Sequence, residues 1–159
     1  MDPNDRPTVW RSPLRRLQGP LYLSCLLLVL IPLVDLVSNV WPLRPWEVGW
    51  RYGAVGLASG FILTPFLGWV AGLALARTLL QPRALLLFSW GSVGVAILLG
   101  GATAVFILDA LQVGEGVPDM GRSTFQIGAV RAAVKLALVG GALGWLGLAG
   151  LHSLRPRDA

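Results

Sequence analysis

The fold is decided by residues 20–40, PLYLSCLLLVLIPLVDLVSNV, in which Asp35 is the only charged residue. A helix of ~20 apolar residues is long enough to cross the ~30 Å hydrocarbon core of a bilayer. The run closes on Ser38, Asn39 and Trp41, without the small-residue cleavage site of a signal peptide. We therefore expect residues 20–40 to be an uncleaved first membrane span.

The composition of the whole chain also indicates a protein that is surrounded by lipid. Of the 159 residues, 55% are hydrophobic and 13% are charged, and the mean hydropathy is +0.68. Soluble domains carry about 25% charged residues. The net charge is +5, but the basic residues flank apolar runs instead of forming a patch with interleaved aromatic residues, so we expect no nucleic-acid partner. The single cysteine, Cys25, lies inside an apolar run and is expected to be a small buried hydrophobe.

Three further apolar runs follow the first, at residues 52–76, 84–108 and 132–152. Together the four runs predict an all-α fold: an integral-membrane four-helix transmembrane bundle formed by one domain, residues 20–152. The remaining residues are expected to form two cytoplasmic tails, residues 1–19 and 153–159.

Turn-forming residues separate the later runs. Residues 77–83, with Gln81 and Pro82 between two arginines, predict a short turn that makes the second and third spans antiparallel. Residues 111–124 are rich in glycine and contain a proline, which predicts a loop. Ser123 and Gln126 match a capping box that would open the fourth helix after that loop.

The arginines give the orientation of the spans. In the four-span topology more of them fall on the side of the two termini than on the other side, and cytoplasmic loops carry the excess of basic residues. We therefore expect both termini in the cytoplasm, in a bacterial inner membrane. The residues on the terminal side are Arg6, Arg11, Arg15, Arg16, Arg77, Arg83, Arg155 and Arg157, against Arg44, Arg51, Arg122, Arg131 and Lys135 on the opposite side.

The connection between the first two spans is crowded with aromatic residues, namely Trp41, Trp46, Trp50 and Tyr52. Pro45 suits the first position of a helix, and Glu47 and Arg51 would then form an i,i+4 pair. We expect an amphipathic helical segment at the non-cytoplasmic interface, where its aromatic side chains anchor the protein. The alternative is an aromatic-walled site for a lipid, a quinone or a pigment.

Four ionisable residues lie at similar depth near the non-cytoplasmic ends of the spans: Asp35, Asp109, Arg131 and Lys135. Ionisable groups inside spans are costly and are functional candidates by default. The structural interpretation is that the two acids neutralise the two bases, while Lys135 extends towards the interface. The functional interpretation is a polar vestibule for protons, an ion or a small solute, and a third is a partner-binding surface.

Glycine pairs at GxxxG spacing indicate close helix packing, at Gly56 and Gly60 and at Gly140 and Gly144. At ~100° per residue, Gly140, Gly144 and Gly147 lie on the side of their helix opposite Lys135. If the charged side faces the bundle interior, the glycine side faces outwards. We expect it to contact a second copy of the chain or another membrane protein.

No catalytic constellation, metal-ligand cluster, nucleotide-binding loop or cofactor motif can be recognised, so we expect neither an enzyme nor a bound cofactor or metal. The first functional hypothesis is an accessory or scaffold subunit that acts through helix–helix contacts. The alternative is a small transporter or channel with a charged vestibule on the non-cytoplasmic side. One observation argues against this alternative: the cytoplasmic half of each span has almost no polar residues to line a conducting path.

Overall fold

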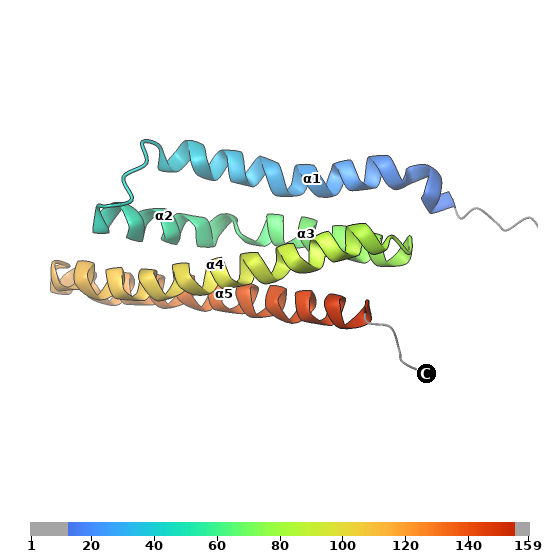
Figure 1. Ribbon diagram of the computed structural model, residues 1–159. Coiled ribbons are helices and arrows are strands. Elements are labelled where there is room, and N and C mark those ends of the chain that lie inside the picture. The colour runs from blue at the N-terminus through green and yellow to red at the C-terminus, as the bar shows by residue number, and fades with distance from the viewer. Residues whose placement is uncertain (1–12, 155–159) are drawn as a thin grey trace, which may run out of the picture.

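The computed structural model describes residues 13–154, and side chains from Leu17 onwards. These residues form five α-helices and no strand, which confirms the all-α prediction for this part of the chain (Figure 1). Residues 1–12 of the predicted tail 1–19 and residues 155–159 of the predicted tail 153–159, with their four arginines, lie outside the described residues. The helices are α1 (Pro13–Val40), α2 (Val48–Phe61), α3 (Leu63–Thr78), α4 (Pro82–Glu115) and α5 (Asp119–Ser153).

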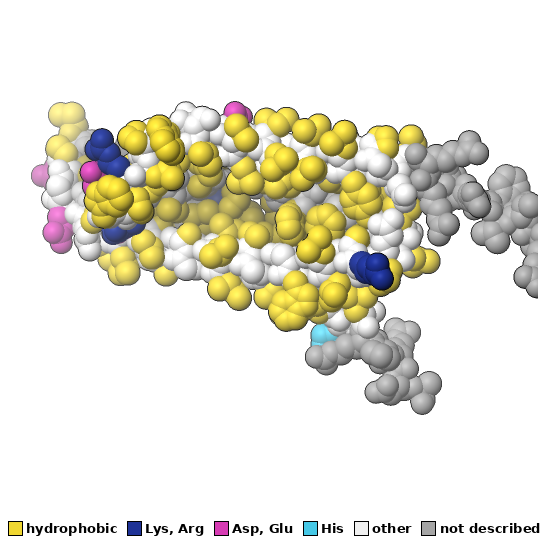
Figure 2. Space-filling model, turned by 45° about the horizontal axis from the view of Figure 1, so that its top comes forward, with side chains coloured by type: hydrophobic (Ala, Val, Ile, Leu, Met, Phe, Trp, Pro, Cys, Tyr) yellow, Lys and Arg dark blue, Asp and Glu magenta, His cyan; other side chains and the backbone are white. Residues whose placement is uncertain are grey.

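Three helices, α1, α4 and α5, are each long and apolar enough to cross a membrane. Helices α2 and α3 meet that criterion only together, as one span bent by 52°. The described chain therefore contains three candidate spans, or four if the bent pair is one span, and it is a membrane protein. Side chains along its flank are largely apolar, and charged groups gather towards one end (Figure 2).

The bend between α2 and α3 has a local cause. Pro65, the third residue of α3, has no N–H group to donate to the carbonyl of Phe61, so one rung of the helical ladder is missing. The ladder resumes when Phe66 N–H donates to the Ile62 carbonyl at 3.1 Å. The run 52–76, predicted as one span, therefore consists of parts of two helices with a kink at its centre.

The helices lie roughly alongside one another (Figure 1). Helix α1 packs mainly on α3, both α2 and α3 pack on α4, and α4 packs along most of α5. Helix α1 is peripheral, since most of its large apolar side chains are exposed. At ~1.5 Å per residue α4 and α5 are each about 50 Å long, which exceeds the hydrocarbon thickness unless they tilt or emerge from it.

The loop predicted at residues 111–124 is wrong. Only residues 116–118 separate α4 from α5, and Ser123 and Gln126 lie inside α5, so they form no capping box. Glycines can lie inside the helices of this region because, without a side chain, they let a facing side chain approach the backbone closely. A Cβ at Gly114, for example, would lie 3.2 Å from the Phe125 ring.

The turn between α3 and α4 forms as predicted, but with an unusual residue at its tightest point. Leu80 adopts a left-handed conformation with φ of 52°. The N–H groups of Leu80 and Gln81 donate to the carbonyls of Arg77 (3.2 Å) and Ala76 (3.0 Å), the Schellman pattern that glycine usually completes. Pro82 then starts α4, where a missing N–H costs nothing.

The glycine face of α5 points inwards, which corrects the prediction that it faces outwards. A Cβ at Gly147 would lie 2.8 Å from the Ser89 carbonyl oxygen, and one at Gly140 would lie 3.4 Å from the Leu99 Cβ. Gly144 is similarly close to α4, at 3.5 Å from the Ala96 Cβ. The glycines thus serve the intrachain contact between α4 and α5.

The glycines of α2 and α3 differ among themselves. A Cβ at Gly68 or Gly72 would clash with α1 or α4, at 2.8 Å from the Leu28 Cβ and 2.7 Å from the Phe88 ring respectively. Gly56 has only an ordinary contact with Phe106 at 3.8 Å. Gly60 has no neighbour within 4 Å, so it makes no intrachain contact of the expected kind.

Candidate functional site

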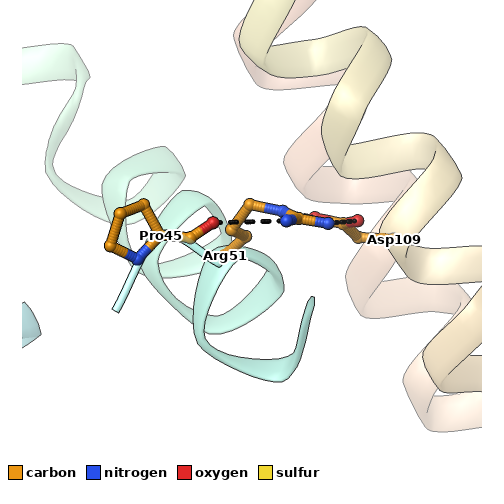
Figure 3. A network of polar contacts seen from close by, with 3 residues as sticks. All are labelled: Pro45, Arg51 and Asp109. Atoms are coloured by element: carbon orange, nitrogen blue, oxygen red, sulfur yellow. Dashed lines mark hydrogen bonds and ion pairs between the residues drawn. The ribbon is translucent and has the colours of Figure 1, made fainter. Parts of the chain in front are cut away.

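The strongest polar contact in the described residues is an ion pair between α2 and α4 (Figure 3). Arg51 Nε donates to Asp109 Oδ2 at 2.9 Å and Arg51 Nη2 donates to Asp109 Oδ1 at 2.8 Å, which is the bidentate geometry of a strong charge-assisted pair. Arg51 Nη1 donates to the Pro45 carbonyl at 3.2 Å. The side chain of Asp109 is 3% exposed and that of Arg51 is 32% exposed.

Aromatic rings flank this pair on the bundle side. The Tyr52 ring stacks on Phe106 with centroids 4.9 Å apart and on Phe125 with centroids 5.2 Å apart. Phe106 is fully buried. The stack joins α2, α4 and α5 next to the ion pair in sequence, since Tyr52 follows Arg51 and Phe106 lies one helical turn before Asp109. A buried carboxylate is tolerated in such surroundings only when a counter-charge and hydrogen bonds satisfy it, as Arg51 does here.

The structure does not assemble the predicted cluster of four charges. Asp109 pairs with Arg51 instead of Arg131 or Lys135, and both of these bases are exposed on α5. Asp35 is exposed on α1, where its backbone carbonyl, and not its carboxylate, accepts a hydrogen bond. Within residues 17–154, none of Asp35, Arg131 and Lys135 forms an ion pair.

Arg51 is the functional residue that the sequence interpretation missed, because that interpretation paired it with Glu47. In the structure Glu47 lies 3.5 Å from Arg44 instead, and α2 begins at Val48, three residues later than the predicted start at Pro45. The available signal was depth: Asp109 and Arg51 both lie at the non-cytoplasmic ends of their predicted spans.

The aromatic connection is partly anchored to the bundle. Trp50 Nε1 donates to the Val40 carbonyl at 3.0 Å and so ties the start of α2 to the end of α1. Trp41 and Trp46 are 70% and 73% exposed. Val40, Trp50, Arg51 and Asp109 thus mark one end of the molecule, named the Arg51 end below.

A second set of polar contacts lies at the opposite end, named the Gln81 end below. The Tyr22 hydroxyl donates to Gln81 Oε1 at 2.8 Å, and Gln81 Nε2 donates to Gln18 Oε1 at 3.3 Å. Along α1 the polar sets near Gln18 and Val40 are about 33 Å apart at ~1.5 Å per residue. This spacing matches the ~30 Å hydrocarbon thickness.

Between the two ends the buried polar side chains are uncharged serines, namely Ser59, Ser89 and Ser92. The Trp69 Nε1 donates to Ser92 Oγ at 2.8 Å, and Ser92 Oγ in turn donates to the Phe88 carbonyl at 2.7 Å. These local hydrogen bonds leave no continuous polar path among the described side chains. At mid-height lies a cleft of about 280 Å³, lined only by apolar and aromatic residues from all five helices and from Ile62 at the bend.

The chain was compared with protein-family models, with curated proteins and with solved structures, and no match was found. The geometry of the chain itself therefore carries the functional argument. Among the described residues no group of three His, Cys, Asp or Glu side chains could hold a metal ion.

Proposed function

We propose that this protein is a non-catalytic accessory or scaffold subunit of the membrane, a four-helix transmembrane unit that binds neighbouring chains through its lipid-facing helix surfaces. The observation that carries the proposal is the distribution of polar groups. The interhelical polar contacts of Arg51, Asp109, Gln81 and Trp69 are made within the chain, and Asp109 is the one buried charged side chain among the described residues. Such a unit is held together internally and leaves its outer faces free for association.

Small residues on the outer surface support a role in helix–helix contacts. Gly94 and Gly101 lie two turns apart on α4, both are exposed, and a Cβ at either position would meet no atom within 4 Å. Gly53 and Gly60 of α2 are open in the same way. Small residues on a lipid-facing side let a neighbouring helix approach closely, which is a main source of association inside bilayers.

The orientation that we propose has the Gln81 end in the cytoplasm, with both termini on that side. Arg77 and Arg83 flank the turn at the Gln81 end. The positive-inside rule counts basic residues in short connections of this kind, near the ends of the spans. In the four-span topology eight basic residues of the sequence fall on this side and five on the other. Accessibility of single introduced cysteines in a Cys25→Ala protein, at position 80 and at position 117, tests the orientation from each side of the membrane.

The native mass of the mildly solubilised protein tests the scaffold function, together with identification of chains that co-migrate with it. We expect a species larger than one chain, and Gly101→Leu should shift it towards the monomer. Gly141→Leu on α5 is the matched control, because Gly141 is also exposed and open. A wild-type protein that is monomeric in its native membrane extract contradicts the proposal.

The bent pair α2–α3 favours one second candidate, a small transporter. Discontinuous helices near the bilayer midplane often form substrate sites in transporters, and the missing donor at Pro65 leaves the Phe61 carbonyl without its helical partner there. Against this candidate, the adjoining cleft is apolar. Flux into proteoliposomes tests it. A transporter should lose flux in Asp35→Asn or Lys135→Gln without losing stability, and a complete absence of flux for protons and small ions contradicts it.

A further inference from the structure

The apolar cleft at mid-height has an edge formed by α5. Val139 and Leu143 of α5 line it, opposite Leu33 and Leu36 of α1. Helix α1 packs on α2 and α3 and not extensively on α5, so the cleft lies where the helix array is not closed by an α1–α5 contact. A pocket bounded by α1 and α5 in this way is accessible from the hydrocarbon core of the bilayer.

Two basic residues continue the lining of α5 towards the Arg51 end. Lys135 lies four residues before Val139, and Arg131 four residues before Lys135, so these residues succeed one another on neighbouring turns of the same side. Both bases are exposed, and neither forms an ion pair among residues 17–154. The cleft itself is apolar, and the two bases lie one and two helical turns from its lining residue Val139, towards the Arg51 end.

The depth of the two bases matches the headgroup boundary. Helix α5 contacts α4 in antiparallel register, with Phe125 near Gly114 and Gly140 near Leu99, which places Arg131 about level with Asp109. Lys135 lies about 6 Å deeper at ~1.5 Å per residue, within reach of the boundary through its four-carbon stem.

One acid lies near the same edge. Asp35 of α1 is exposed and lies three residues after Pro32, which lines the cleft, so it offsets one of the two bases and leaves one net positive charge. The carboxylate of Asp109 is already held by Arg51. The charge at the edge of the cleft is therefore positive.

We propose that the cleft binds one anionic phospholipid, with an acyl chain between α1 and α5 and its phosphate group on Lys135 and Arg131. The volume of about 280 Å³ lies just below the range of drug-sized sites, which suits a single hydrocarbon chain. The side chains of the lining offer no free polar group to a polar substrate, because Trp69 Nε1 already donates to Ser92. Basic edges between transmembrane helices recognise anionic headgroups in this manner. This site is independent of the scaffold function.

Quenching of tryptophan fluorescence by brominated lipids tests the site, with the full chain in phosphatidylcholine vesicles. Brominated-chain phosphatidylglycerol is added at a low mole fraction and compared with brominated-chain phosphatidylcholine at the same fraction. Trp69 lines the cleft and reports its occupancy. We expect phosphatidylglycerol to quench more strongly, and the surplus to be absent in Trp69→Phe and displaced by unlabelled phosphatidylglycerol.

Variants of the basic residues separate a specific site from general charge attraction. Lys135→Gln should weaken phosphatidylglycerol binding about fivefold, the ratio equivalent to ~1 kcal/mol for one basic residue near the surface. Lys135→Arg should retain binding, and so should Arg83→Gln, which removes the same charge at the opposite end. Equal quenching by the two lipids in the wild-type protein overturns the proposal, as does an equal loss in Lys135→Gln and Arg83→Gln.

Discussion

Arg51→Gln is the substitution that should cost this protein most. It removes the guanidinium group that gives Asp109 two hydrogen bonds, at 2.8 and 2.9 Å, and leaves a carboxylate that is 3% exposed without its counter-charge. Breaking a buried ion pair from one side costs about 3–5 kcal/mol. Arg51 is itself one-third exposed, so we expect the lower end, about 3 kcal/mol.

The free energy of unfolding can be measured in mixed micelles of a mild detergent and sodium dodecyl sulfate, followed by circular dichroism. Arg44→Gln is the control, because Arg44 faces Glu47 across 3.5 Å at the surface and both side chains are about half exposed. Exposed pairs contribute about 0–1 kcal/mol. Removing both partners, in Arg51→Met with Asp109→Leu, should recover much of the loss, since no buried charge remains. A loss in Arg51→Gln no larger than in Arg44→Gln refutes the reasoning.

Three further substitutions test the packing by the same measurement. Gly147→Ala should destabilise the protein by about 1–3 kcal/mol because its new methyl group overlaps α4, whereas Gly141→Ala, which meets no atom, should be neutral or slightly stabilising. Leu80→Gly should stabilise it by up to ~1 kcal/mol, because glycine relieves the left-handed backbone and the lost side chain is 87% exposed; destabilisation would show that the strain is not there. Trp69→Phe should cost about 1 kcal/mol through its lost hydrogen bond, and the exposed Trp90→Phe should cost less; equal costs contradict this role.

The element types could be predicted from the sequence, because long apolar runs leave the chain no alternative to helix. The kink at Ile62 and the lengths of α4 and α5 could not be predicted in this way. Pro65 removes one helical hydrogen bond, but a membrane helix can accommodate such a proline, so the sequence marks where a bend can form and not how large it is. Likewise Gly114 and Gly121 indicate a loop by composition, but the facing surfaces of α4 and α5 stabilise helix through that region.

The candidate site was predictable in its depth but not in its partners. The sequence singled out Asp109 as an ionisable residue within an apolar run, and its side chain is buried. Its partner Arg51 lies 58 residues away in sequence, and no local spacing connects the two. The nearby Glu47 offered Arg51 a pair at helical spacing. A local pair of exposed groups contributes little, however, whereas the guanidinium of Arg51 neutralises a buried carboxylate.

The glycine face of α5 shows why periodicity alone leaves the inward side undetermined. The angle between Lys135 and Gly140 or Gly147 follows from helical geometry, and the structure keeps these residues on opposite sides. Which side faces inwards depends on the region of the bilayer around the helix, because charged side chains avoid the hydrocarbon core but not the headgroup region. Because Arg131 and Lys135 lie near the boundary, outward placement costs them little, whereas turning the glycines outwards would forfeit the close contact of Gly147 with Ser89. The packing of α4 against α5 therefore sets the rotation of α5 and leaves its two bases on the surface, where an anionic headgroup can meet them.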